Sequence, residues 1–493
     1  MAADRRTWFV VPAAAALLLW PALWNGYPIV FADTGTYLSQ AIHRYAGWDR
    51  PVFYSMFMFP LHATVTLWPV AIAQALLTAW VLWLVCRTFV PGVTAPLFIG
   101  GAGLLAAGTW LPFLVSEAMP DLFTPLMVLL MCLLALGPPR QPMLLAVLAA
   151  FMIATQLSSL PLACGLAMVL GFMRSAPACT LDTASPPGAC CDAGRANPSP
   201  NRRWLLLIAP PVLAVTGLCV VNLAAHGRFG VSPFGNIFML ARVIYDGPGM
   251  TALRRDCPSI HWRLCPFLST FPPTSDDFLW TPDSPLNRAG GPKIVSRDAD
   301  AIIRSALRAD PVGEARAALD NTLRQLVRFQ SGDGLTAWPD QVSPVIARDF
   351  PARELAAYTA ARQQAGSLSV PPLLAWIHRI VAVSGVAGCV LLLPAAIRRR
   401  SACAVLLLAV LIALPLSAAI TGGLSAPHDR YQARIMWLPP FSAVLSLAAL
   451  RQRWQTSASA RQQSCPAKHE LRACPTPQSE TMVVGHGLRR RRA

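Results

Sequence analysis

Long apolar blocks constrain this chain more than any other feature of its sequence. They run over 10–19, 71–86 and 402–420 and lack the periodic polar face of a helix in a soluble protein. An α-helix of about 20 apolar residues spans the roughly 30 Å hydrocarbon core of a bilayer. Since 54% of the residues are hydrophobic and only 13% are charged, we predict an all-α polytopic membrane protein.

The blocks predict about ten transmembrane helices. The first block follows Arg5 and Arg6 but ends in Trp20, Pro21 and Trp24. Because no small-x-small cleavage site follows, it is interpreted as an uncleaved anchor rather than a signal peptide. The spans are placed near residues 7–24, 58–86, 94–115, 120–137, 142–157, 160–173, 204–225, 372–396, 402–421 and 434–450.

The basic residues orient these spans. The net charge of +17 is concentrated in short connections and in the tail, so it indicates positive-inside topology and contact with anionic membrane lipids; no nucleic-acid binding is expected. With both termini cytoplasmic, every short basic connection except 428–434 lies inside. Composition favours a bacterial inner membrane. The cytoplasmic clusters are Arg5/Arg6, Arg87, Arg140, Arg174/Arg202/Arg203, Arg398/Arg399/Arg400 and Arg451/Arg453.

Residues 142–173 allow two topologies. They are too few for two full spans and too many for one, and Gln156, Ser158, Ser159 and Pro161 interrupt them. We interpret them as two short helices. One tilted span is the alternative, and it would invert everything downstream and place Arg398–Arg400 outside.

The spans define four regions. Residues 1–225 form a seven-span module with a disordered cytoplasmic loop at 174–203, and residues 226–371 form a mostly helical extracytoplasmic domain between spans seven and eight. Three C-terminal spans occupy 372–450, and a basic disordered tail occupies 451–493. The domain either folds alone or lies over the spans. It contains an amphipathic helix starting at Asp310-Pro311, and its two cysteines, Cys257 and Cys265, are a candidate disulfide in an oxidising compartment.

Polar residues gather at the outer ends of the predicted spans, whereas the span interiors are almost free of charge. A transporter is expected to place charges near the middle of the membrane. The distribution therefore favours a site at the outer membrane–water boundary that faces a lipid headgroup. The candidates are Asp33, Tyr37, His43 and Arg44 in the first outer loop, Glu117 and Asp121 in the second, Gln156 in the third, and His428, Arg430 and Arg434 before the last span.

The acidic candidates each have two interpretations. Asp33 either caps a short helix, with Tyr37 one turn on, or acts as a general base toward an acceptor hydroxyl. Glu117 and Asp121 are four residues apart, so they share a face if one helix includes both. Asp121 follows Pro120, and the alternative is a first-turn acid favoured by the helix dipole.

Arg430 and Arg434 are one helical turn apart on the predicted outer side, against the positive-inside trend. Guanidinium groups bind phosphate or pyrophosphate through two parallel hydrogen bonds, so we favour a phosphate site. The alternative is interfacial snorkelling with Asp429 as a local partner.

Three of these motifs together resemble the GT-C glycosyltransferase superfamily, which includes protein O-mannosyltransferases and lipid A aminoarabinose transferases. Asp33-x-x-x-Tyr37 after the first span resembles the acidic motif of that superfamily's first outer loop. Pro120-Asp121-Leu-Phe-Thr resembles its second acidic motif, and Thr155-Gln156-Leu-Ser-Ser-Leu-Pro161 resembles its polar–Pro turn. The resemblance covers about residues 1–225. Position 156 is Gln where a basic residue is common, so we assign the donor phosphate to Arg430 and Arg434.

The resemblance implies a polyprenyl-phosphate-linked sugar as donor and transfer on the outer face to an acceptor glycan, lipid or protein. It also implies Asp33 as catalytic base, with Glu117 or Asp121 supporting the acceptor or a divalent metal. Two other classes stay open: a non-catalytic scaffold whose outer domain binds a partner, and a transporter of a lipid-linked substrate.

Overall fold

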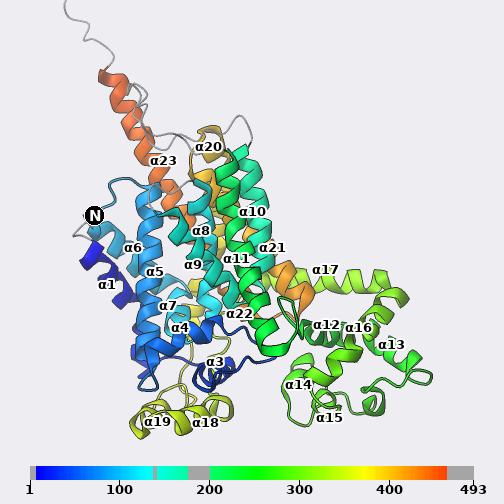
Figure 1. Cartoon of the computed structure of the whole chain (residues 1–493). Helices are drawn as coiled ribbons and strands as arrows, with labels where there is room; N and C mark the ends of the chain where they lie inside the picture. Colours follow the sequence, from blue (N-terminus) through cyan, green and yellow to red (C-terminus); the bar gives the residue numbers. More distant parts are fainter. Residues whose placement is uncertain (1–6, 137–140, 176–199, 464–493) are drawn as a thin grey trace, which may run out of the picture. The chain divides into compact units, whose positions relative to one another are not determined.

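The computed structural model describes residues 7–136, 141–175 and 200–463 of the chain. Within these ranges all regular secondary structure is helical, and one β-bridge joins Ile29 to Glu117 (Figure 1). Residues 176–199 of the predicted loop and 464–493 of the predicted tail lie outside the description. The first helices are α1 (Thr7–Leu18), α2 (Trp20–Asn25), α3 (Ala32–His43), α4 (Phe53–His62), α5 (Trp68–Phe89), α6 (Ala95–Gly108), α7 (Leu111–Ser116), η1 (Pro120–Leu122), α8 (Phe123–Leu136), α9 (Pro142–Thr155), α10 (Ser159–Ser175) and α11 (Pro200–His226).

The second half of the chain continues as helices of very unequal length. One compact unit ends at Leu450, but the last helix runs to Gln463, so residues 451–463 of the predicted disordered tail are helical. The elements are α12 (Gly235–Tyr245), α13 (Pro248–Asp256), η2 (Cys265–Phe267), α14 (Ser275–Trp280), α15 (Pro285–Arg288), α16 (Pro292–Ala309), α17 (Pro311–Val327), α18 (Pro339–Asp349), α19 (Ala352–Thr359), α20 (Pro372–Arg398), α21 (Cys403–Leu424), α22 (Asp429–Ala433) and α23 (Leu438–Gln463).

Five helical segments of the described chain are long and apolar enough to cross a membrane. They are α5, α11, α20, α21 and the segment Asp429–Gln455, which includes α22 and most of α23. α5 begins at Trp68, ten residues after the predicted start of its span at 58. The reason is a break after α4, where Ala63 and Thr64 adopt positive φ angles of 44° and 55°.

The other five predicted spans correspond to shorter apolar helices. α6, α8 and α9 each have 14 residues, which is about 21 Å of helix against a roughly 30 Å hydrocarbon core. Proline and glycine account for two of the breaks: Pro21 follows the end of α1, and Gly108 ends α6 before Pro112 begins a new turn. α9 and α10 are separate helices, in agreement with the interpretation of residues 142–173.

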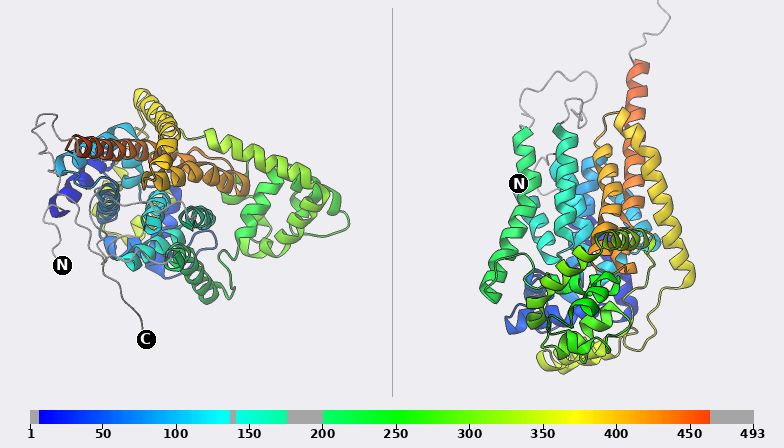
Figure 2. Two further views of the ribbon diagram at one scale, coloured as in Figure 1. Left: turned by 90° about the horizontal axis from the view of Figure 1, so that it is seen from above. Right: turned by 90° about the vertical axis from the view of Figure 1, so that its right-hand side faces the viewer.

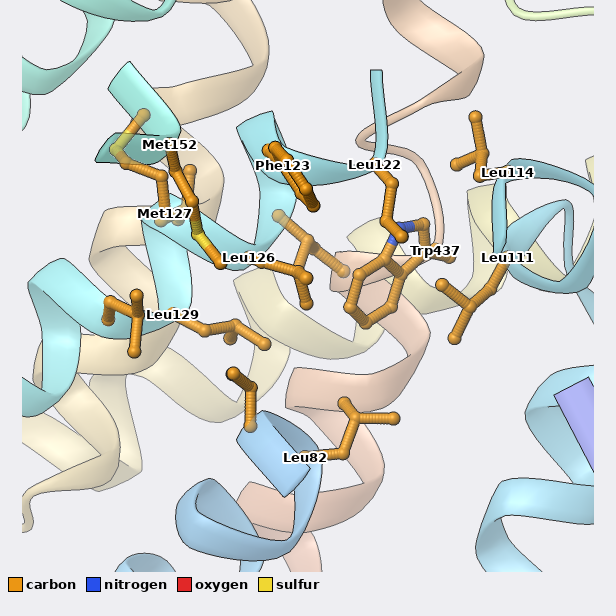
Figure 3. Packing of buried hydrophobic residues seen from close by; sticks show 14 of the residues in the cluster. Leu82, Leu111, Leu114, Leu122, Phe123, Leu126, Met127, Leu129, Met152 and Trp437 are labelled. Atoms are coloured by element: carbon orange, nitrogen blue, oxygen red, sulfur yellow. The ribbon is translucent and has the colours of Figure 1, made fainter. Parts of the chain in front are cut away.

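α8 lies at the centre of the main hydrophobic core. All of its 14 residues are buried, and it packs against α5, α9, α10, α11 and α21. Figure 3 shows Phe123 and Leu126 of this helix among Leu82, Met152 and Trp437, which come from distant parts of the chain. A helix that is apolar on every face is expected in such a central position.

Residues 226–371 divide between two cores. A small second core gathers apolar side chains between Ile237 and Ile303, from α12 to α16. Cys257 and Cys265 form a disulfide beside it, with Cα atoms 5.5 Å apart. By contrast, Leu335, Ile346 and the other apolar side chains of α18, α19 and their loops belong to the main core. The predicted single domain thus contains one part with its own core and one part that packs on the apolar helices.

The contact between α3 and α18 is close enough to be tested. Gly35 of α3 lies against the main chain of α18, and a Cβ atom at residue 35 would collide with the carbonyl oxygen of Gln341. We expect Gly35→Ala to lower the free energy of unfolding by about 1–3 kcal/mol, because the backbones must separate. Thermal unfolding in detergent measures the loss. Gly100→Ala in α6, where the added methyl meets open space, is the control, and equal stability of the two variants contradicts the close contact.

Candidate functional site

Main-chain hydrogen bonds hold the loop between α2 and α3 against the segment between α7 and η1. Ile29 N–H donates to the carbonyl of Ser116 (2.9 Å), and Ala118 N–H donates to the carbonyl of Ile29 (2.8 Å). The Gln74 amide of α5 donates to the Glu117 carbonyl at 2.7 Å. These bonds bring the two segments that carry the acidic candidates side by side.

Asp33 lies in the first turn of α3 but does not cap it. The N-cap is Phe31, whose N–H donates to the Thr34 hydroxyl at 2.9 Å. Thr34 in turn donates to the carbonyl of Ala118 (3.1 Å). The interpretation of Asp33 as a helix cap is therefore wrong. The Thr34 hydroxyl accepts the Phe31 N–H, and the Asp33 carboxylate bonds to other residues.

Those partners are two arginines from distant parts of the chain. Arg50 Nη2 donates to Asp33 Oδ1 at 2.9 Å, and Arg430 Nη2 lies 3.7 Å from Asp33 Oδ2. The Asp33 and Arg430 side chains are only 13% and 16% exposed. Coulomb attraction is stronger at such sites than in water, so the two guanidinium groups hold the Asp33 side chain between them.

Asp121 forms a second, more deeply buried ion pair. Arg434 Nη1 donates to Asp121 Oδ1 at 2.9 Å, and the side chains are 1% and 4% exposed. Gln156 Nε2 donates to the same oxygen at 2.9 Å, and Arg434 Nη2 donates to the Ser158 hydroxyl at 3.1 Å. The pair therefore joins η1, the turn between α9 and α10, and the end of α22.

Glu117 lies between these pairs without a direct ionic partner among the described residues. It ends α7 in an extended conformation, whereas Asp121 lies in η1, so the two acids share no helix. Burial is the largest cause that raises the pKa of Glu117 well above its usual range, and the neighbouring Asp121 carboxylate adds to it. Arg430 acts in the opposite direction but does not cancel the effect. Its surroundings thus shift Glu117 toward its protonated form.

α22 positions both distant arginines. Arg434 N–H donates to the Arg430 carbonyl at 3.1 Å, so the two residues are one turn apart as predicted. The Arg430 guanidinium lies 4.1 Å from the Phe31 ring centre, and the main-chain N–H of Arg430 donates to Asp333 Oδ2 at 2.9 Å. Snorkelling with Asp429 is ruled out, because Arg434 is buried and Asp429 pairs with Arg328 at 3.2 Å.

Each of the three site arginines keeps a buried nitrogen without a hydrogen-bond partner among the described residues. These atoms are Arg50 Nε, Arg430 Nη1 and Arg434 Nε. An unpaired buried donor costs free energy, and such groups in a native fold point to a function or an unseen ligand. The cluster therefore has spare hydrogen-bond donors for an anion.

The remaining predicted residues are distributed unevenly. Tyr37 is buried beside the cluster; burial and the nearby Asp33 carboxylate raise its pKa, and its ring packs on Tyr54. His428 is half-buried, with Nε2 3.5 Å from Asp276 Oδ2. His43 and Arg44 lie apart: His43 contacts Asp349 at 3.0 Å, and Arg44 is exposed at the end of α3.

Sequence reasoning left three contributors without a role. Arg50, Ser158 and Asp333 all contact the candidate residues. Arg50 was visible as a polar residue of the first loop, but nothing in the sequence pairs it with Asp33. Asp333 lies about 300 residues from Asp33, in a loop that no motif marks.

A cavity of about 530 Å³ lies on the other side of the loop that carries Asp333. Residues 330–332 and 335–337 line it together with the first turns of α20, including Trp376 and Arg379. Residues 333 and 334 lie between these two stretches of the loop: Asp333 bonds Arg430, and Gly334 lies against Phe31 and Glu117. One loop thus separates the cavity from the charged cluster.

No protein-family model matches the chain, and no curated protein or solved structure matches it significantly. Within the described ranges, no group of three or more His, Cys, Asp or Glu side chains is arranged to hold a metal ion.

We expect Arg434→Met to destabilise the fold by about 3–5 kcal/mol, because it leaves the Asp121 carboxylate buried without its cation. Chemical unfolding in detergent measures the change. Arg324→Met, which removes an exposed pair with Asp320, is the matched control and should cost at most about 1 kcal/mol. Adding Asp121→Asn to Arg434→Met should restore part of the loss, whereas additive losses would show that the two groups do not interact.

The raised pKa of Glu117 predicts a pH-dependent stability. The folded state holds this proton more tightly than the unfolded chain, whose Glu pKa is about 4.3, so Glu117 destabilises the fold increasingly as pH rises above that value toward the folded pKa. Glutamine resembles the protonated acid. The Tm of Glu117→Gln minus that of the wild type should therefore grow between about pH 5 and pH 8. A difference that is constant or shrinks with pH contradicts the assignment, and the exposed Asp320→Asn serves as the control.

Proposed function

We propose that the chain is a membrane glycosyltransferase that moves a sugar from a polyprenyl-phosphate donor to an acceptor hydroxyl. The observation that carries the proposal is the convergence of Asp33, Glu117 and Asp121 with Arg50, Arg430 and Arg434 in one cluster. Such a cluster combines a carboxylate for proton abstraction with cations for a phosphate. The resemblance of its motifs to GT-C enzymes supports the same activity.

The proposal includes a membrane arrangement finer than the five candidate spans. We propose ten membrane-embedded segments, with the short helices α1, α6, α8, α9 and α10 shielded by the longer ones. The cluster would then lie at the extracytoplasmic boundary, and both termini and the basic connections would face the cytoplasm of a bacterial inner membrane. The burial of α8 among five other helices supports this arrangement, since a shielded helix need not match the bilayer thickness.

In this mechanism Asp33 is the general base. Its carboxylate is bound on both sides by arginines, which hold it in place to accept the proton of an acceptor hydroxyl. The acceptor oxygen then bonds to the anomeric carbon as the bond from that carbon to the phosphate oxygen breaks. Lipid phosphate is a good leaving group, so the step needs charge stabilisation more than a strong acid.

The arginines would supply that stabilisation. Arg430 is suited to the donor phosphate because it lies next to Asp33 and has an unpaired Nη1. Preorganised cations act most strongly where water is excluded. Arg434 is held on Asp121, Gln156 and Ser158, so it would position Arg430 one turn away rather than move during the reaction.

The test is transfer of radiolabelled sugar from a panel of polyprenyl-phosphate donors in proteoliposomes. We expect Asp33→Asn to lose at least about 100-fold of the wild-type rate, the usual range for removal of a general base. Asp320→Asn, a change of the same chemistry at an exposed position of α17, should keep full activity, and thermal unfolding confirms that both variants fold. Equal rates for Asp33→Asn and the wild type would remove Asp33 from the mechanism. A wild type inert toward every donor would favour the scaffold alternative.

A further inference from the structure

The helix α17 has its polar face buried and its apolar face exposed. Its buried residues are Glu314, Asn321 and Gln325, which lie on one side of the helix at spacings of four and seven residues. The opposite side carries aliphatic residues whose exposed fractions range from 36% to 71%. These are Val312, Leu319, Leu323, Leu326 and Val327.

Three polar contacts fix the helix in this rotation. Glu314 forms a buried ion pair with Arg242 of α12. Asn321 donates to Asp246 at 2.9 Å, and Gln325 exchanges two hydrogen bonds with the main chain of His428, at 2.8 and 2.9 Å. A rotation that buried the apolar face would break all three. The exposure of the aliphatic stripe therefore follows from the polar contacts that α17 makes with the rest of the fold.

The position of α17 at one end of the candidate span α21 indicates that membrane lipid covers the exposed stripe. The helix lies against the last turn of the candidate span α21, where a Cβ atom at Gly422 would lie 2.5 Å from the Asn321 carbonyl oxygen. α21 has 22 residues, about 33 Å of helix, so its ends lie near the two surfaces of a bilayer. α20 packs on α21 and is joined to it by a short connection, so the first turn of α20 lies at the same level.

That first turn of α20 has the side chains of a membrane–water boundary. Trp376 is 60% exposed, and the Arg379 guanidinium lies 5.3 Å from its ring centre. Tryptophan is enriched at this depth of membrane proteins, and a long arginine side chain near a helix end reaches the headgroup region. Figure 1 shows α17 crossing the direction of α10 and α11, with α12–α16 on one side of it, and the left view of Figure 2 shows α17 and α12–α16 extending together away from the remaining helices.

We propose that α17 is an in-plane membrane helix whose aliphatic stripe inserts at the boundary between lipid headgroups and acyl chains. Helices of this kind combine an apolar face with basic residues along its edge. Arg316 is exposed on the same helix and matches the charge of anionic headgroups, whereas Arg324 pairs with the exposed Asp320. The inference rests on the membrane-spanning helices and not on the proposed transferase activity.

Photo-crosslinking in the full chain tests this assignment. p-Benzoyl-phenylalanine replaces Leu319 or Leu323, and the protein is irradiated in nanodiscs of phosphatidylethanolamine and phosphatidylglycerol. Mass spectrometry then measures lipid adducts on the peptide that contains the probe. The positive reference is Leu391 of α20, which is 77% exposed on a candidate span, and the negative reference is Ile260, 45% exposed beside the small second core.

We expect adduct yields at 319 and 323 close to that at 391 and several-fold above that at 260. Yields no higher than at 260 would overturn the proposal. Crosslinks mainly to a second copy or to another protein would also overturn it, because the stripe would then be a protein interface. Two probe positions guard against a folding defect in one variant, and thermal unfolding checks each.

Discussion

The buried pair of Asp121 and Arg434 is the interaction on which the arrangement of the site depends. The two residues are 313 positions apart, and almost nothing of either side chain reaches solvent. A buried ion pair stabilises a fold less than its Coulomb energy suggests, because both charges lose water, but removing one partner is very costly. The pair therefore selects one arrangement of η1, the α9–α10 turn and α22. Gln156 and Ser158 complete its hydrogen bonds and keep that arrangement unique.

The same pair determines where Arg430 lies. Since Arg430 is one helical turn before Arg434, anchoring Arg434 on Asp121 directs Arg430 toward Asp33 and Phe31. Two acid–arginine contacts one turn apart thus hold α3 and η1 against α22. Glu117 lies within the field of these charges, and the balance between burial, Asp121 and Arg430 determines its protonation.

The sequence predicted part of the set of residues that gather, but not how they pair. Polar residues at the ends of apolar blocks must lie near the membrane surface, so Asp33, Glu117, Asp121 and Arg430 were recognisable from their positions alone. Their local roles were harder to predict. Aspartate is a common N-cap residue, yet the Thr34 hydroxyl and not Asp33 accepts the N–H at the start of α3. Glu117 and Asp121 have helical spacing, but the break between α7 and η1 separates them. Ion pairs such as that of Asp33 and Arg50 depend on tertiary packing, which spacing does not encode.

The chain order of the site also limits what the motif resemblance can explain. Asp33, Glu117 and Asp121 belong to the first 225 residues, but Asp333 and the α22 arginines come from segments more than 200 residues later. The part of 226–371 that packs on the main core, from residue 329 onward, closes over the first loop: Gln363 bonds both main-chain groups of Val30, at 3.1 and 2.7 Å. A seven-span module alone would therefore leave Asp121 without its cation. Since an unpaired buried charge is strongly unfavourable, the arrangement of Asp121 in the site requires the C-terminal segments as well as the N-terminal helices.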